Sequence, residues 1–286
     1  MSKPIYRLSS IARPLEPQYP TNRAVLILLP LIALATGAAA FVLRDAGLAG
    51  AASAGLAGLL AAFLAWALGR EVDPDRNEAA FIAMALTVAA LILGYAPALW
   101  VLALALMATR IVVRTVGQAA KLTDLAIVTV LAGMAVFLDG YWAMGLVAAF
   151  AMALDLLYDR KRTLNLVFAA FATSFSMFAV VQRGGEWGAL TLEPLGLVNP
   201  AWSLAALILT ALSAIFILTC PAITSVCDAN GAPLERRRVR GGAVMVVLFA
   251  TAAMFEAQAG LLATLPVWAV LAGMVAGRVW PRRKRA

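Results

Sequence analysis

The sequence lacks histidine altogether and contains only two cysteines, Cys220 and Cys227. Without histidine there can be no histidine-ligated haem, no histidine-based zinc site and no imidazole to shuttle protons near neutral pH. The two thiols fall near the expected cytoplasmic end of one helix, where thiols stay reduced, so we expect no disulfide. Seven positions apart, they would share a helical face if that helix continued beyond Pro221, and we interpret them as buried small side chains.

Charge is also scarce. Charged residues make up 13% of the 286 positions and hydrophobic residues 63%, which leaves too little polar surface to cover a soluble core. The net charge is +8, but the basic residues form short clusters beside apolar stretches and do not line one polar face. This pattern matches the positive-inside rule for membrane helices. We therefore expect the lipid bilayer as a partner and no nucleic acid.

Ten apolar stretches are predicted to be membrane-spanning helices. A hydrocarbon core of about 30 Å needs roughly 20 apolar residues, and several of the stretches are shorter than this. Gly94 to Pro97 and the pair Asp139-Gly140 separate neighbouring stretches and predict tight reversals. The predicted spans are Ala24–Val42, Leu48–Leu68, Ala79–Leu93, Pro97–Val112, Leu122–Leu138, Tyr141–Leu157, Leu164–Val181, Ala201–Leu218, Ala243–Gln258 and Leu265–Val279.

The distribution of basic residues orients these spans. With the N-terminus inside, all of the 23 Lys and Arg residues except Arg44 and Arg183 fall in cytoplasmic segments. We predict an all-α polytopic integral membrane protein of about ten transmembrane helices, with the N-terminus and the C-terminus cytoplasmic, in the cytoplasmic (inner) membrane. Its parts are a cytoplasmic N-terminal arm at 1–23, a single transmembrane domain at 24–280 and a basic cytoplasmic tail at 281–286. We expect no cleavable signal peptide.

The second span is rich in Gly and Ala. Small residues such as Gly50, Gly55 and Gly58 let helices approach closely in lipid. We favour packing inside the protein for this face, with a homo-oligomer through it as the alternative.

Charged residues near or inside spans mark the candidate sites. Glu256 is the one acid expected well inside a span, as an intramembrane acid near the outer end of the ninth helix. The other candidates form a polar cluster at the cytoplasmic edge of the membrane. Its members are Asp73, Asp75, Arg110, Arg114, Asp124, Asp155 and Asp159.

Two interpretations of this edge stay open. Arg110 and Arg114 are four apart on the fourth helix, and Asp155 and Asp159 are four apart on the sixth, so ion pairs would cross-link the two helices. Asp124 would then simply start the fifth helix. Alternatively, the separated acids would coordinate a Mg²⁺ ion that binds a diphosphate, and the arginines would bind the remaining oxygens of the diphosphate.

The second interpretation resembles the UbiA-type intramembrane prenyltransferases, which carry Asp-rich motifs after their second and sixth helices. Asp73, Asp75 and Glu78 occupy the first position here, and Asp155 and Asp159 the second. The resemblance implies an enzyme acting on an isoprenoid diphosphate with Mg²⁺. The chain departs from the family at Pro74, which interrupts the first motif.

The layout of ten helices with both ends inside is similar to that of the drug/metabolite transporter superfamily, which implies an inverted five-plus-five repeat. Nucleotide-binding, zinc and Ser-His catalytic motifs are absent from the sequence. We therefore predict a carrier of a small neutral or amphipathic solute, with no cofactor and no dedicated metal. The alternatives are an intramembrane enzyme on an anionic or isoprenoid-diphosphate lipid, the one case that calls for Mg²⁺, and a noncatalytic membrane assembly protein.

Overall fold

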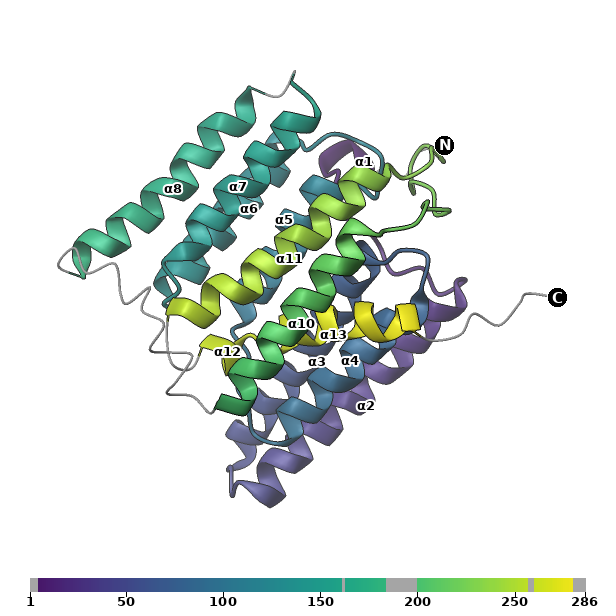
Figure 1. Ribbon diagram of the computed structural model, residues 1–286. Helices are drawn as coiled ribbons and strands as arrows, with labels where there is room; N and C mark the ends of the chain where they lie inside the picture. Colours follow the sequence, from purple (N-terminus) through teal and green to yellow (C-terminus); the bar gives the residue numbers. More distant parts are fainter. Residues whose placement is uncertain (1–4, 161–162, 184–199, 257–259, 280–286) are drawn as a thin grey trace.

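The computed structural model describes residues 5–160, 163–183, 200–256 and 260–279, and the regular secondary structure within these ranges is helical (Figure 1). The described residues hold a single isolated β-bridge, between Val226 and Pro233. The helices are α1 (Ile5–Leu8), α2 (Pro20–Leu43), α3 (Leu48–Val72), α4 (Asn77–Ile92), α5 (Leu99–Val113), α6 (Leu122–Phe137), α7 (Ala143–Tyr158), α8 (Leu164–Gln182), α10 (Pro200–Leu218), α11 (Arg236–Glu256), α12 (Gly260–Ala263) and α13 (Leu265–Val279).

Each predicted span corresponds to one of the long helices, so the all-α prediction is confirmed. Nine of the ten agree at both ends within four residues. The prediction was wrong for the ninth, α11, which begins at Arg236 and not at Ala243. Its basic first turn was expected in a loop, but the structure gives Arg238 a buried carboxylate partner, and this favours helix there.

Four of the helices are long and apolar enough to cross a membrane: α2, α3, α8 and α10. The helices α4, α5, α6, α7 and α13 are apolar but have only 15 or 16 residues. At about 1.5 Å per residue, such helices reach roughly 24 Å. The structure thus supports a membrane protein by length and composition.

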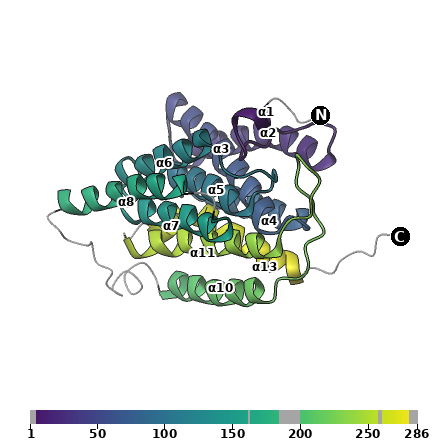
Figure 2. The same cartoon turned by 90° about the horizontal axis from the view of Figure 1, so that it is seen from above.

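The core lies around α5, in which every residue from Val101 to Val113 is buried except Ala103 and Met107. This helix packs against α3, α6, α7 and α11. The outer helices are α2, which packs on α3 at one edge, and α8, which packs on α6 and α7 at the other (Figure 1). Figure 2 shows α10 along a third side, next to α11 and α13.

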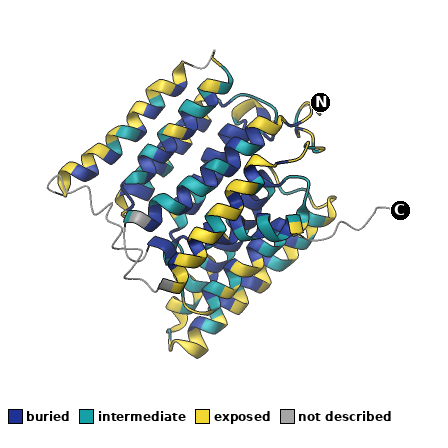
Figure 3. Ribbon diagram, viewed as in Figure 1, coloured by how far each residue is buried: buried dark blue, intermediate teal, exposed yellow. Residues whose placement is uncertain are grey.

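The outer faces of the helices are apolar, whereas buried carboxylates lie inside. Figure 3 shows exposed positions along the outside of α2, α8 and α10. Large apolar side chains occupy these positions: Ile27, Leu31, Leu34, Phe171, Phe178, Leu204, Ile208 and Ile215. Glu71, Asp124 and Asp155 are fully buried. A continuous apolar exterior is costly in water and favourable in lipid, so this distribution fits a bilayer environment.

Tight turns connect the helix pairs that follow each other closely in the sequence, α4 with α5 and α6 with α7. Gly94 between α4 and α5 has φ +99°, and Gly140 between α6 and α7 has φ +84°. Only glycine adopts such angles without steric cost, and the chain can therefore turn within a few residues.

The glycine-rich face of α3 packs against α2 of the same chain. A Cβ atom at Gly55 would lie 2.8 Å from the carbonyl oxygen of Ala33, and one at Gly58 would lie 2.2 Å from Thr36 Oγ1. Close approach of two backbones explains why these positions hold glycine. Packing inside the protein, the favoured interpretation, accounts for Gly55 and Gly58.

The helix contacts do not divide into two similar halves. In the first half α3 packs against α2, α4 and α5, but its counterpart α8 packs against α6 and α7, and neither α10 nor α11 contacts it appreciably in the described structure. The inverted repeat implied by the transporter-like layout is therefore not visible in the packing.

Candidate functional site

All ten long helices have one terminus at the same end of the bundle, called here the polar end. It is defined by the carboxylates of Glu71, Asp73, Asp124 and Asp155 and their partners. Together with the hydrogen bonds of Arg70 to Thr21 and of Arg76 to the carbonyl oxygen of Gly277, these contacts reach the N-termini of α2, α4, α6, α8 and α11 and the C-termini of α3, α5, α7, α10 and α13. The polar end is thus where helix termini distant in sequence are joined.

Glu71 is the centre of the first ion cluster. Arg13 Nη1 and Arg110 Nε each lie 3.0 Å from Glu71 Oε1. Arg13 also bonds Asp228, with 2.7 Å between Nε and Oδ2, and Arg110 donates to the carbonyl oxygen of Ile11. The cluster joins the N-terminal arm, α3, α5 and the segment before α11.

Two arginines compensate for the burial of Glu71. Its side chain is 0% exposed, and isolated burial of a carboxylate would be costly. Burial acts to lower the pKa of Arg13, but the carboxylates of Glu71 and Asp228 outweigh it and raise that pKa, so Arg13 remains charged. The second predicted span ends at Leu68, which would put Glu71 in the loop that follows. That was wrong, because α3 continues to Val72 and ends just before Asp73-Pro74.

Asp155 is the centre of the second cluster. Arg114 donates two hydrogen bonds to its carboxylate, from Nε to Oδ1 at 2.9 Å and from Nη2 to Oδ2 at 3.0 Å. Arg238 Nη1 lies 2.9 Å from the same Oδ1. Asn165 donates to the same carboxylate at 3.1 Å, and Arg114 also reaches Asp159 at 3.1 Å. The predicted cross-link between the fourth and sixth helices is therefore present, formed by Arg114 and not by Arg110.

Arg114 adopts an unusual backbone conformation. It ends α5 with φ +57°, in the left-handed region that favours glycine. A glycine there would relieve the strain but would lose the ion pairs to Asp155 and Asp159. The side-chain contacts explain why a non-glycine residue occupies the position.

Asp124 fastens the N-terminal arm to α6. Its carboxylate accepts from the hydroxyls of Ser9 and Ser10, both at 2.6 Å, and from the backbone N–H of Ser10 at 2.8 Å. It also accepts from the N–H of Lys121 at 2.9 Å, the contact expected of an acid at a helix start. The predicted helix-start role holds, and the arm is a second partner.

Asp73 and Asp75 have separate partners. Asp73 lies 3.5 Å from Arg278 Nε, beyond hydrogen-bond range, and its burial raises its pKa despite the attraction of Arg278 and Arg76. Asp75 accepts from the N–H of Thr224 and from the N–H and hydroxyl of Ser225 at 2.6–2.8 Å. These two acids therefore face different segments of the chain.

The cytoplasmic-edge candidates thus meet at one end of the bundle but not around one ligand. Among the described residues, Asp73, Arg110 and Asp155 have no ion-pair partner in common. Within the described ranges, no three Cys, Asp or Glu side chains lie close enough together to hold a metal ion. Two of the acids that a diphosphate-bound Mg²⁺ would need, Asp75 and Asp155, already bind protein groups.

Glu256 lies at the other end of the bundle. It is the last residue of α11, and its Oε1 accepts from the N–H of Ala143 at 2.9 Å, at the start of α7. It therefore caps a neighbouring helix and does not reach the polar end.

The two cysteines do not share a helical face. A shared face required the eighth helix to continue beyond Pro221, but α10 ends at Leu218, as the predicted span does. Both thiols are buried and free, Cys220 beside Arg278 and Cys227 against the segment around Arg114.

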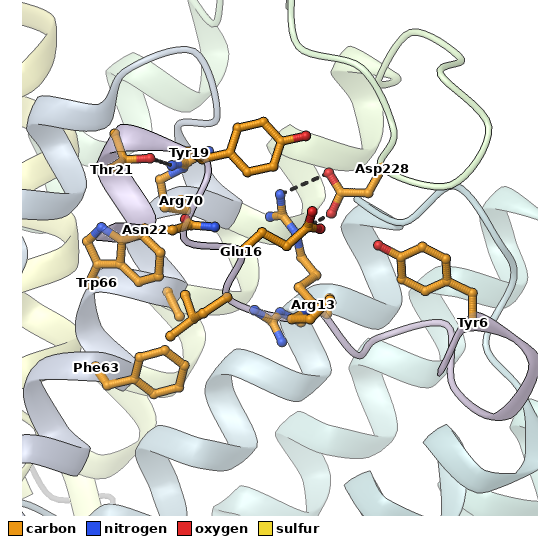
Figure 4. Close-up of a pocket in the computed structure, with 14 residues that line it drawn as sticks. Tyr6, Arg13, Glu16, Tyr19, Thr21, Asn22, Phe63, Trp66, Arg70 and Asp228 are labelled. Atoms are coloured by element: carbon orange, nitrogen blue, oxygen red, sulfur yellow. Dashed lines mark hydrogen bonds and ion pairs between the residues drawn. The ribbon is translucent and has the colours of Figure 1, made fainter. Parts of the chain in front are cut away.

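A pocket of about 260 Å³ opens at the polar end, between the N-terminal arm, α2, α3 and α5 (Figure 4). Figure 4 shows Trp66 and Phe63 on one side and Asp228 and Tyr6 on the other. The remaining lining includes Arg13, Arg70, Arg110, Leu15, Glu16, Tyr19, Thr21 and Asn22. The pocket therefore combines an apolar aromatic wall with a wall rich in guanidinium groups.

Most of the pocket and network residues were not among the predicted candidates. Arg13, Arg238 and Arg278 entered the sequence analysis only as orienting charges. The sequence did hold a signal that Glu71 is helical. No helix-breaking residue lies between Leu68 and Asp73-Pro74, so α3 could be expected to continue for one more turn. For Asp228 and Arg238 the local sequence holds no such signal.

Comparison with known proteins identifies no relative. No protein-family model, curated protein or solved structure matches this chain. The function must therefore be argued from the site itself.

Proposed function

We propose that this protein is a multi-pass carrier of a small amphipathic solute, and that the pocket at the polar end is its binding site. The proposal includes ten transmembrane helices with both termini cytoplasmic, in the cytoplasmic (inner) membrane. One observation carries the solute class: the pocket sets Phe63 and Trp66 opposite polar and charged groups. Ligand sites of this kind hold an apolar part by shape and a polar part by a few placed groups.

The topology is supported by the meeting of the helix termini. Each helix terminus assigned to the cytoplasm by its basic residues has a contact at the polar end. That arrangement and the short reversals at Gly94 and Gly140 support the proposal of ten alternating crossings. The positive-inside rule then directs the polar end toward the cytoplasm.

The catalytic alternative has less support. A diphosphate enzyme needs acids free to hold Mg²⁺, but Asp155 is held by Arg114 and Arg238. Asp75 is likewise held by Thr224 and Ser225. A carrier needs only a shaped site that opens to one side at a time.

Cysteine labelling tests the topology. In a background lacking Cys220 and Cys227, Arg7→Cys at the polar end should react only with reagent on the cytoplasmic side. Leu138→Cys, exposed between α6 and α7, should react only from the other side. The opposite pattern, or labelling of both from one side, would reject the proposed threading.

Exchange in proteoliposomes tests the carrier activity. Vesicles of phosphatidylcholine loaded with unlabelled hexyl phosphate or hexyl glucoside should take up the radiolabelled probe faster than protein-free vesicles. Phe63→Ala should slow that exchange, and Phe171→Ala, exposed on α8, should not. If neither probe exchanges above the protein-free rate, the carrier proposal fails.

A further inference from the structure

The pocket lining holds three arginines, Arg13, Arg70 and Arg110, and two carboxylates, those of Glu16 and Asp228. Arg13 and Arg110 are paired with Glu71 and Asp228, so these two arginines and two carboxylates compensate one another. Arg70 also lines the pocket, and no carboxylate of the described residues lies within ion-pair distance of it. Among the described residues, Arg70 is therefore the lining arginine that has no carboxylate in ion-pair range.

The guanidinium of Arg70 makes fewer hydrogen bonds than it has donors. Its Nη1 lies 3.4 Å from Thr21 Oγ1, at the long limit for a hydrogen bond, and its Cζ lies 5.8 Å from the centroid of the Trp66 ring. Its Nε is buried without a hydrogen-bond partner. A guanidinium offers five donors, and burying one that is unpaired is unfavourable. The Arg70 guanidinium is therefore positioned by Thr21 and Trp66, but its hydrogen-bonding capacity is not filled by the described residues.

We propose that the pocket binds an organic phosphate, and that Arg70 binds the phosphate group. This rests on the pocket of the proposed function but not on transport. A guanidinium matches phosphate oxygens in a two-point fork. The stacked position over Trp66 orients that fork, and Phe63 and Trp66 supply the surface for the apolar part of the ligand.

The volume of the pocket limits the size of the ligand. At about 260 Å³ the pocket is smaller than typical sites for drug-sized molecules, which begin at about 300 Å³. A phosphate with a short alkyl or ring substituent fits, and so does the phosphate head of a lipid whose chains stay in the bilayer. Both sources share the same chemistry at Arg70.

Binding to the full-length protein in phosphatidylcholine nanodiscs tests the proposal. The probes are hexyl phosphate, neutral hexyl glucoside and inorganic phosphate, followed by calorimetry. We expect hexyl phosphate to bind most tightly, and Arg70→Gln to weaken it about ten-fold or more while hexyl glucoside is unaffected. Arg70→Lys should restore part of the affinity.

Arg23→Gln is the matched control. It removes the same charge from an exposed position on α2 outside the pocket lining and should leave binding unchanged. If Arg70→Gln keeps a wild-type melting temperature and binds hexyl phosphate as tightly as wild type, the proposal is overturned. Equal binding of hexyl glucoside and hexyl phosphate would overturn it too.

A second arm separates the two sources. Nanodiscs containing phosphatidylglycerol should reduce the apparent affinity for hexyl phosphate if a lipid head takes the site, and leave it unchanged if the ligand is soluble. Either result supports the phosphate site. Binding at Arg70 without exchange in proteoliposomes would reject the carrier and retain this site, so the two proposals fail separately.

Discussion

Arg13 Nη1 lies 3.0 Å from Glu71 Oε1, a contact between the N-terminal arm and the last turn of α3. Arg13 is 22% exposed and Glu71 is fully buried, so the arm provides part of the charge that lets a carboxylate sit at the end of the bundle. Arg110 provides the rest from α5. The arm is therefore an integral part of the fold at the polar end.

Arg13→Ala should loosen the arm. Glu71 keeps Arg110, so we expect a moderate loss of about 1–3 kcal/mol in the free energy of unfolding. The arm should also become more sensitive to proteinase K than in the wild type. Thermal unfolding in detergent and the digestion pattern measure the two effects. Arg7→Ala, exposed on α1, is the control, and equal behaviour of both variants would refute the role of Arg13.

Asp155→Asn should be far more damaging than Asp159→Asn. The first leaves the buried Arg238 and the half-buried Arg114 beside a neutral group, and breaking such a cluster costs about 3–5 kcal/mol. Asp159 is 29% exposed, and an ion pair so accessible to solvent contributes little, so the loss of its charge should cost about 1 kcal/mol or less. The measurement is the unfolding midpoint of each purified variant. Similar midpoints would mean that the Asp155 cluster contributes little.

Gly55→Ala should separate α2 from α3. The new Cβ would lie 2.8 Å from the backbone oxygen of Ala33, which cannot move alone, and overpacking of this kind typically costs about 1–3 kcal/mol. Gly47→Ala, which meets nothing within 4 Å, is the control. Melting temperature and size-exclusion profile distinguish the causes. A loss of oligomer with unchanged protomer stability would instead support the alternative that this face joins two copies.

Asp75→Asn should change the response to acid. Burial acts to raise the pKa of Asp75, but hydrogen bonds from Ser225 and Thr224 outweigh it and lower the pKa below 3.8. A carboxyl whose pKa falls on folding stabilises the fold above its unfolded pKa, and that contribution is lost as the pH falls through the lowered value. The stability gap between wild type and variant should therefore be full above about pH 4 and shrink below it.

Asp73→Asn should change the pH dependence of stability in the opposite direction. Burial raises the pKa of Asp73, so its contribution is present below the unfolded value and is lost as the pH rises through the raised one. Melting temperatures of both variants over a pH series test the pair. Parallel curves for Asp73→Asn and Asp75→Asn would contradict both assignments.

The helices could be predicted because their signals are local. Apolar length set the ranges of α3 and α8, and Gly94 and Gly140 marked reversals that the backbone then adopts. The site was less predictable. Asp155 and Arg114 could be proposed as partners because their four-residue spacings were visible on two helices, but Arg238 could not, since 83 positions separate it from Asp155.

What the sequence determined by itself is the helical architecture, because apolar length and turn residues act over a few neighbouring positions. Only the tertiary structure decided which charges meet: that Arg13 and Arg110 share Glu71, and that Arg70 lies beside Trp66 with no carboxylate of the described residues in ion-pair range. The physical reason is that an ion pair depends on the distance between side chains in space. That distance is set by the packing of all ten helices and not by spacing along the chain.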